Sequence, residues 1–150
     1  MSHSLAKIYL HIVFSTKHRL ALIDERIENE LHAYLGGICN KHECYPVKIG
    51  GYWDHVHLLC LLSKKISVIN LIENLKSSSS GWIKKQNVDY ENFYWQSGYG
   101  AFSVGLSDVG RVKTYIENQH EHHKTITFQD EFRELLRSHH IDYDERYVWD

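Results

Sequence analysis

Hydrophobic residues in the first half of the chain follow a strand-like pattern in some segments and a helix-like pattern in others. Residues 7–15 are rich in β-branched and aromatic side chains and predict a strand. From Asp24 to about Lys41 the apolar residues recur every three or four positions, which predicts an amphipathic helix. Two further strands are predicted over residues 45–51 and 55–62, joined by a short connection rich in turn-forming residues.

The next segment adds one helix and one strand to this series. Helical spacing of apolar residues covers 67–85, and strand-like residues follow at 93–95 and 99–106, with a break at Gly98. The order β-α-β-β-α-β predicts an α+β, ferredoxin-like (RRM-like) fold, in which an antiparallel sheet has both helices on one face. The other face is then open to a ligand, to a partner or to the rest of the chain.

Two more helices are predicted in the C-terminal part. Ser107 or Asp108 is expected to cap the first of them, which runs to about His122. Thr127 is expected to cap the second. Both helices follow the last strand and are extra to the ferredoxin-like arrangement.

Length and composition fit a single domain and exclude several classes of protein. The 150 residues predict one domain over 1–150, with a core from about 5 to 138. A hydrophobic content of 43% and a charged content of 24% exclude a mainly disordered chain. No apolar run is long enough for a membrane span, no secretory signal is visible, and the three cysteines are an odd number. A cytoplasmic protein without a membrane partner is therefore predicted.

The predicted third strand carries His55 and His57, separated by Val56. Side chains two residues apart on a strand point to the same face, so both imidazoles can reach one metal ion. The spacing alone is a weak signal, because the chain has twelve histidines and a second such pair at His120 and His122. Histidines with no ligand remain the alternative.

The helix that begins near Asp108 carries a second chemical feature. At about 100° per residue, Tyr115 and Gln119 lie one turn apart on the shoulder of its apolar face. Such a tyrosine is most often a half-buried packing residue. Next to two histidines, however, the Gln119 amide oxygen completes a set of three ligands for Mg²⁺ or Mn²⁺. The phenol of Tyr115 can then attack a phosphodiester that the ion polarises.

These motifs together resemble those of the single-tyrosine HUH transposases, which small insertion sequences encode and which move single-stranded DNA. The resemblance rests on two motifs, DHVHLL at 54–59 and YIENQ at 115–119. Supporting stretches are STKHR at 15–19 and WQSGYGAFSV at 95–104. The similarity extends over about residues 5–132, with the motifs in the family's order.

The resemblance implies a role for each residue of the motifs. Tyr115 would be the catalytic nucleophile that becomes joined to a 5′ phosphate of DNA, while His55, His57 and Gln119 would hold Mg²⁺ or Mn²⁺. The enzyme would cleave and rejoin single-stranded DNA next to hairpins at the ends of the element. It would act as a homodimer whose active sites are composite, the tyrosine helix of one subunit completing the site of the other.

Net charge gives no sign of a nucleic-acid partner, since 17 basic and 19 acidic residues leave −2. DNA binding would therefore require a local cluster of basic side chains. The residues predicted to contact phosphates are Lys17, Arg19, Lys84, Lys85, Arg111 and Lys113. The alternative for each of them is an ordinary solvated charge.

Two other interpretations of the whole chain remain open at this stage. One is a module whose open sheet face holds single-stranded DNA or RNA without cutting it. The other is a domesticated transposase that processes hairpins of host repeats by the same chemistry. A zinc-protease motif is disfavoured, because Lys124 stands where the HExxH pattern that begins at His120 requires its second histidine.

Overall fold

Four strands form one antiparallel sheet in the computed structural model, which describes residues 3–150. The strands are β1 (Tyr9–Ser15), β2 (Pro46–Tyr52), β3 (His55–Leu61) and β4 (Gly100–Val104), in the order β2-β3-β1-β4. The two most apolar strands, β1 and β3, occupy the centre, and their residues are almost all buried. The predicted ferredoxin-like arrangement is confirmed.

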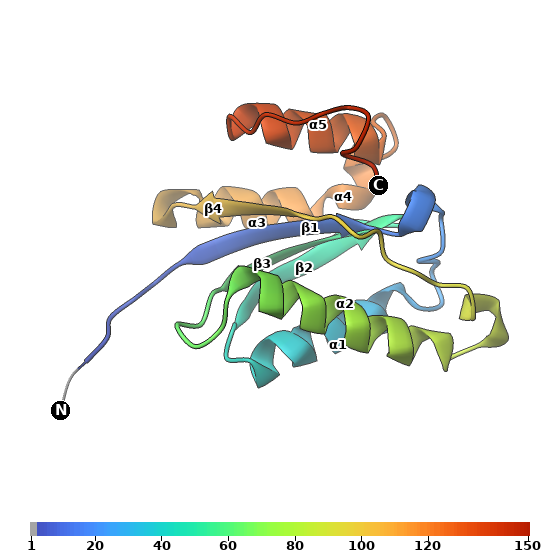
Figure 1. The fold of residues 1–150 in the computed structure, drawn as a ribbon, viewed down its shortest axis with the longest axis horizontal. Helices are drawn as coiled ribbons and strands as arrows, with labels where there is room; N and C mark the ends of the chain where they lie inside the picture. Colours follow the sequence, from blue (N-terminus) through green and yellow to red (C-terminus); the bar gives the residue numbers. More distant parts are fainter. Residues whose placement is uncertain (1–2) are drawn as a thin grey trace.

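Helices cover both faces of this sheet (Figure 1). One face carries α1 (Glu28–Lys41) and α2 (Val68–Lys84), as predicted. The other face carries α3 (Val109–Glu117), α4 (Gln119–His122) and α5 (Phe128–Ser138). The face that the β-α-β-β-α-β order leaves open is therefore occupied by the C-terminal part of the same chain. Within residues 3–150, no helix is both long and apolar enough to cross a bilayer.

The alternation of side chains along β3 divides the interior into two parts. Val56, Leu58 and Cys60 point toward α1 and α2, where they join the largest apolar cluster. Leu59 points the other way and packs against α3. Since His55 and His57 share the parity of Leu59, both imidazoles lie on the α3 and α5 side of the sheet, and both are fully buried.

The region before β4 differs from the prediction. Residues 93–95 do not form a strand, and β4 starts only at Gly100. Trp95 pairs with Thr16 in an isolated bridge, and its ring packs edge-on against Phe14 and Phe93. Packing of large aromatic rings therefore fixes this segment, and a pattern based on strand propensity does not distinguish such packing from a regular ladder.

The predicted helix from Asp108 to His122 is in fact divided in two. It breaks at Asn118, whose backbone leaves helical geometry between α3 and α4. Asn is a poor residue for a helix interior, because its side chain competes for backbone hydrogen bonds. Asp108 stands at the N-cap position without a capping hydrogen bond from its side chain, whereas the Thr127 hydroxyl accepts from the Asp130 amide as predicted.

Helix α3 approaches β2 very closely at one point. A Cβ atom on Gly50 would lie 2.6 Å from the Ile116 carbonyl oxygen and 2.8 Å from Ile116 Cγ2. Both distances are shorter than van der Waals contact. Only glycine at this position lets α3, with Tyr115 next to Ile116, rest directly on the sheet.

We therefore expect Gly50→Ala to displace α3 and lower the free energy of unfolding by about 1–3 kcal/mol, as overpacking does in other cores. Urea denaturation followed by circular dichroism measures this change. Gly37→Ala is the matched control, because its Cβ would meet nothing within 4 Å in an exposed turn of α1. The control should stabilise the helix by about 0.5–1 kcal/mol. Equal stability of the wild type and Gly50→Ala would contradict the role of this close approach.

Candidate active site

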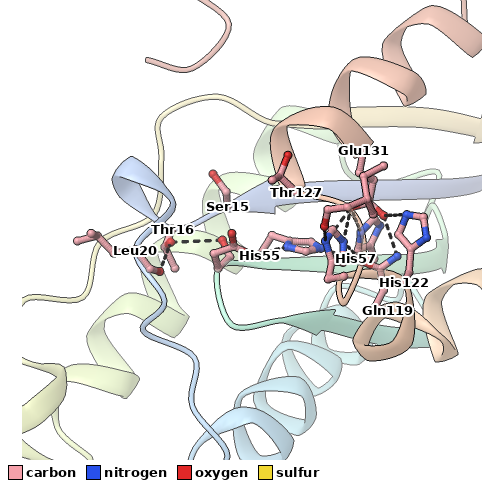
Figure 2. Close-up of polar contacts among 12 residues, drawn as sticks. Ser15, Thr16, Leu20, His55, His57, Gln119, His122, Thr127 and Glu131 are labelled. Atoms are coloured by element: carbon pink, nitrogen blue, oxygen red, sulfur yellow. Dashed lines mark hydrogen bonds and ion pairs between the residues drawn. The ribbon is translucent and has the colours of Figure 1, made fainter.

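The two histidines of β3 are held in place through their Nδ1 atoms. His55 Nδ1 lies 2.7 Å from Asp54 Oδ1, and His57 Nδ1 lies 2.8 Å from His11 Nε2 on the neighbouring strand β1. Both contacts leave the Nε2 atoms directed into the space between the sheet and α5 (Figure 2). A histidine fixed through one ring nitrogen presents the other in a defined direction, as metal sites require.

Helix α3 and the first residue of α4 bring Tyr115 and Gln119 to the same place. The Gln119 Oε1 atom lies 2.8 Å from His55 Nε2, and Gln119 is buried. The Tyr115 ring stands edge-on to His57, with 5.7 Å between ring centroids. The four residues that the sequence predicts for the site are thus adjacent.

A carboxylate that the sequence analysis does not single out lies at the centre of this cluster. Glu131 reaches in from α5 and is 2% exposed. Its Oε1 atom lies 3.3 Å from His55 Nε2, 3.1 Å from His57 Nε2 and 3.0 Å from His123 Nε2. Its Oε2 atom accepts hydrogen bonds from the Tyr115 hydroxyl and from Gln119 Nε2.

The sequence does contain a signal for Glu131. The face of α5 that is buried includes Phe128, Phe132 and Leu136, and Glu131 lies on the same face of the helix. An acidic residue on an apolar stripe is rarely buried unless it is paired or binds a metal. His123 has a weaker signal, because it follows Gln119 by four residues across the end of α4.

The protonation of the site is shaped by burial and by this charge. Burial alone would raise the pKa of Glu131, but the surrounding imidazoles hold it far below its usual range. Burial lowers the pKa of His55, yet hydrogen bonds to Asp54 and Glu131 outweigh it and raise the value to about 9. His55 therefore carries a proton that a cation bound at Nε2 would have to replace.

The pKa of Tyr115 is shifted upward as well. Burial and the negative charge of Glu131 raise the pKa of its phenol well above the usual value. The hydroxyl is protonated in this arrangement and donates its hydrogen to Glu131.

The donor atoms of the cluster fit a divalent cation. Ligand atoms of His55, His57 and Glu131 lie within 4.8 Å of one another, and so do those of His122, His123 and Glu131. Gln119 adds an amide oxygen beside His55 and His123. Imidazole nitrogens together with carboxylate and amide oxygens are ordinary ligands of divalent ions.

A cleft of about 280 Å³ gives access to Tyr115 from the β4 side. It lies between β4, α3 and α5, and its lining includes His11, Ser103, Arg111, Tyr115, Ser138 and His139. Tyr115 is therefore half-buried beside this cleft, whereas Glu131 is almost completely buried.

The six basic residues predicted to contact DNA do not form a single surface. Arg111 and Lys113 are exposed on α3, whereas Lys84 and Lys85 lie at the end of α2 on the opposite face of the sheet. Lys17 is exposed in the 3₁₀ turn after β1.

Arg19 follows Lys17 in this turn, but its guanidinium already has partners within the chain. It donates to Gln96 Oε1 at 3.2 Å and to the Trp149 carbonyl oxygen at 3.0 Å. Arg19 therefore ties the C-terminal segment to the end of β1.

Comparison with known proteins agrees with this architecture. Residues 4–119 match the family described as "Transposase IS200 like". The transposases of insertion sequence element IS200 from Salmonella typhimurium and Salmonella typhi are each 26% identical over 129 residues, covering 83% of this chain and 84% of the relative.

Two solved structures share the fold. A protein of Deinococcus radiodurans described as a transposase superposes with a TM-score of 0.63 and 20% identity, covering 79% of this chain and 95% of the other. A REP-associated tyrosine transposase bound to a REP hairpin gives a TM-score of 0.61 and 11% identity, with coverage of 84% and 76%. The family match, which spans most of the chain, shows that this protein belongs to the IS200-like transposases.

Proposed function

We propose that this transposase cleaves and rejoins single-stranded DNA at the ends of an insertion sequence, with Tyr115 as the nucleophile. The observation that carries the proposal is the position of the Tyr115 hydroxyl. It meets Glu131 in the same space into which His55 and His57 direct their Nε2 atoms. Metal-assisted phosphoryl transfer needs a nucleophile and cation ligands in one site.

In the proposed reaction the phenolic oxygen of Tyr115 attacks a phosphorus atom of the DNA backbone, and the bond from phosphorus to the 3′ oxygen breaks. One strand leaves with a free 3′ hydroxyl, and the other stays joined to Tyr115 through its 5′ phosphate. The proton lost by the phenol is balanced by the proton that the 3′ oxygen gains. Attack by a 3′ hydroxyl on the phosphotyrosine reverses the step, so rejoining needs no energy source.

The chain's own residues hold the nucleophile in its inactive protonated form until DNA and a cation arrive. Glu131 accepts the phenolic hydrogen, and its charge opposes formation of the phenolate. A divalent cation such as Mg²⁺ or Mn²⁺, held by His55, His57 and Gln119, would supply the positive charge that polarises the phosphodiester and favours the phenolate.

The proposed DNA substrate carries a hairpin near the cleavage site. The REP-associated transposase that shares the fold is bound to such a hairpin. Arg111, at the mouth of the cleft that leads to Tyr115, and the exposed Lys113 and Lys17 are proposed to contact phosphates, with Arg19, Lys84 and Lys85 as further contacts. A homodimer with composite sites, in which the tyrosine helix of one subunit completes the site of the other, stays a prediction.

The processing of host repeat hairpins by a domesticated copy is a second candidate. Its support is the structural similarity to the REP-associated enzyme. The chemistry would be the same, and only the DNA that flanks the gene separates the two candidates. A module that binds nucleic acid without cutting it is less well supported, because binding alone does not require a tyrosine beside buried imidazoles.

Tyr115→Phe should abolish covalent attachment of the protein to DNA, because it removes the attacking oxygen and little else. Single-stranded DNA from the ends that flank the gene is mixed with protein and Mg²⁺ or Mn²⁺, and adducts are resolved on denaturing gels. Tyr45→Phe is the matched control at an exposed position and should form adducts like the wild type. Formation of adducts by the Tyr115→Phe variant would contradict the assignment of Tyr115 as the nucleophile.

His57→Ala should lower the cleavage rate by at least about 100-fold while hairpin binding changes little, because the imidazole serves the cation and not the DNA. Cleavage gels and fluorescence anisotropy measure the two effects separately. His120→Ala, at an exposed residue of α4, is the control and should cleave normally. Thermal melting of each variant shows whether the fold is retained. Cleavage by a folded His57→Ala protein at the normal rate would contradict the role of His57.

A further inference from the structure

Glu131 and His123 lie outside residues 4–119, the part of the chain that matches the transposase family. Glu131 is nevertheless buried at the centre of the candidate site, and the side chain of His123, which contacts it, is only 2% exposed. Their contacts point to a role in the site that goes beyond the motifs of β3 and α3.

Three imidazoles from two parts of the chain converge on one oxygen of Glu131. The Nε2 atoms of His55, His57 and His123 lie 3.0–3.3 Å from Oε1, and the first two come from β3 while the third follows α4. Figure 2 shows Glu131 directed from α5 toward His55 and His57. Atoms brought together in this way from separate parts of the chain form a site with a defined centre.

Each of these imidazoles is also fixed on its other side. His55 Nδ1 faces Asp54, His57 Nδ1 faces His11, and His123 Nδ1 lies 2.9 Å from the Ile126 carbonyl oxygen. A contact at Nδ1 fixes the ring and holds Nε2 in one direction, and such a second contact is typical of histidines that bind a metal. His123 has the same two-sided arrangement as the histidines of the HUH motif.

We propose that Glu131 and His123 are ligands of the same cation as His55 and His57, and that this nitrogen-rich site prefers Mn²⁺ to Mg²⁺. The proposal rests on the cation site of the proposed function and extends it. His122 is left out of the ligand set, because it is 35% exposed and lies 3.5 Å from the other oxygen of Glu131, on the Tyr115 side.

The preference for Mn²⁺ follows from the chemistry of the donors. Three imidazole nitrogens stand beside one carboxylate and the amide oxygen of Gln119, which lies 2.8 Å from His55 Nε2 and 3.0 Å from His123 Nε2. Mg²⁺ favours oxygen ligands and retains several waters, whereas imidazole suits first-row transition metals. A site with only two histidine ligands and one amide oxygen would show a smaller difference between its affinities for Mn²⁺ and Mg²⁺.

The experiment has to distinguish a metal-ligand role of Glu131 from a role in which it only neutralises the charge of the histidines. A carboxylate that only neutralises the histidines would occupy the space between them and hinder a cation. Its removal would then strengthen metal binding or leave it unchanged. Removal of a ligand would weaken metal binding instead.

The test measures metal binding by the full chain in the absence of DNA. Protein freed of metal with a chelator is titrated with Mn²⁺, and free Mn²⁺ is followed by electron paramagnetic resonance, with Mg²⁺ added as competitor. Wild-type protein should bind Mn²⁺ at least about 10-fold more tightly than Mg²⁺. Glu131→Gln and His123→Gln should each weaken Mn²⁺ binding by at least about 10-fold.

The chain offers a matched control for each variant. Glu134→Gln changes an exposed carboxylate one turn further along α5, and His120→Gln changes an exposed histidine of α4. Both controls should bind Mn²⁺ like the wild type. Glu131→Asp keeps the charge but shortens its reach, so it should also weaken binding, which covers the case in which Glu131→Gln fails to fold.

Unchanged or tighter Mn²⁺ binding by folded Glu131→Gln would overturn the ligand role of Glu131, and the same result with His123→Gln would overturn that of His123. Equal affinities of the wild type for Mn²⁺ and Mg²⁺ would overturn the preference. None of these outcomes touches the Tyr115 adduct assay, so the proposed function can stand while this inference fails. Metal binding as expected without any DNA adduct would remove the proposed function alone.

Discussion

The negative charge of a carboxylate buried among imidazoles has to be compensated by the groups around it. This requirement connects the C-terminal half of the protein to the sheet. Glu131 is separated from water by the same helix that places Phe128 and Phe132 in the core. An unpaired charge at this depth would be strongly destabilising. The contacts of Glu131 with β3, α3 and the end of α4 therefore fix how these elements meet.

The spacing of the residues on α3 and α4 serves the same requirement. Tyr115, Gln119 and His123 are each four residues apart, and the helical turn continues across Asn118, so all three side chains face Glu131. Gly50 lets α3 lie low enough on β2 for Tyr115 to reach the carboxylate.

Much of the fold and half of the site could be predicted because they depend on local periodicity. His55 and His57 share a face because they are two residues apart on a strand, and Tyr115 and Gln119 because they are one helical turn apart. Apolar spacing likewise predicts the four strands and the helices to within a few residues, apart from the segment around Trp95 and the break at Asn118.

Residues whose role depends on packing between distant elements could not be predicted in this way. His11 meets His57 through the pairing of β1 with β3, and Glu131 reaches His55, His57 and His123 only after α5 folds over the sheet. Arg19 is a second example, in which packing gives a predicted DNA-binding residue a partner within the chain. A basic residue after β1 suggests a phosphate contact, but only the folded chain places Trp149 against its guanidinium.

The alternation of side chains along β3 has a consequence for how this sequence can change during evolution. Its odd-numbered residues from 55 to 59 place two imidazoles in the site and Leu59 against α3, and its even-numbered residues from 56 to 60 face the main core, so a single strand encodes both. Deletion or insertion of one residue would exchange the two faces, sending imidazoles into the apolar core and aliphatic side chains into the site. Variation in β3 is therefore restricted to substitutions, and each is constrained by the face on which it falls.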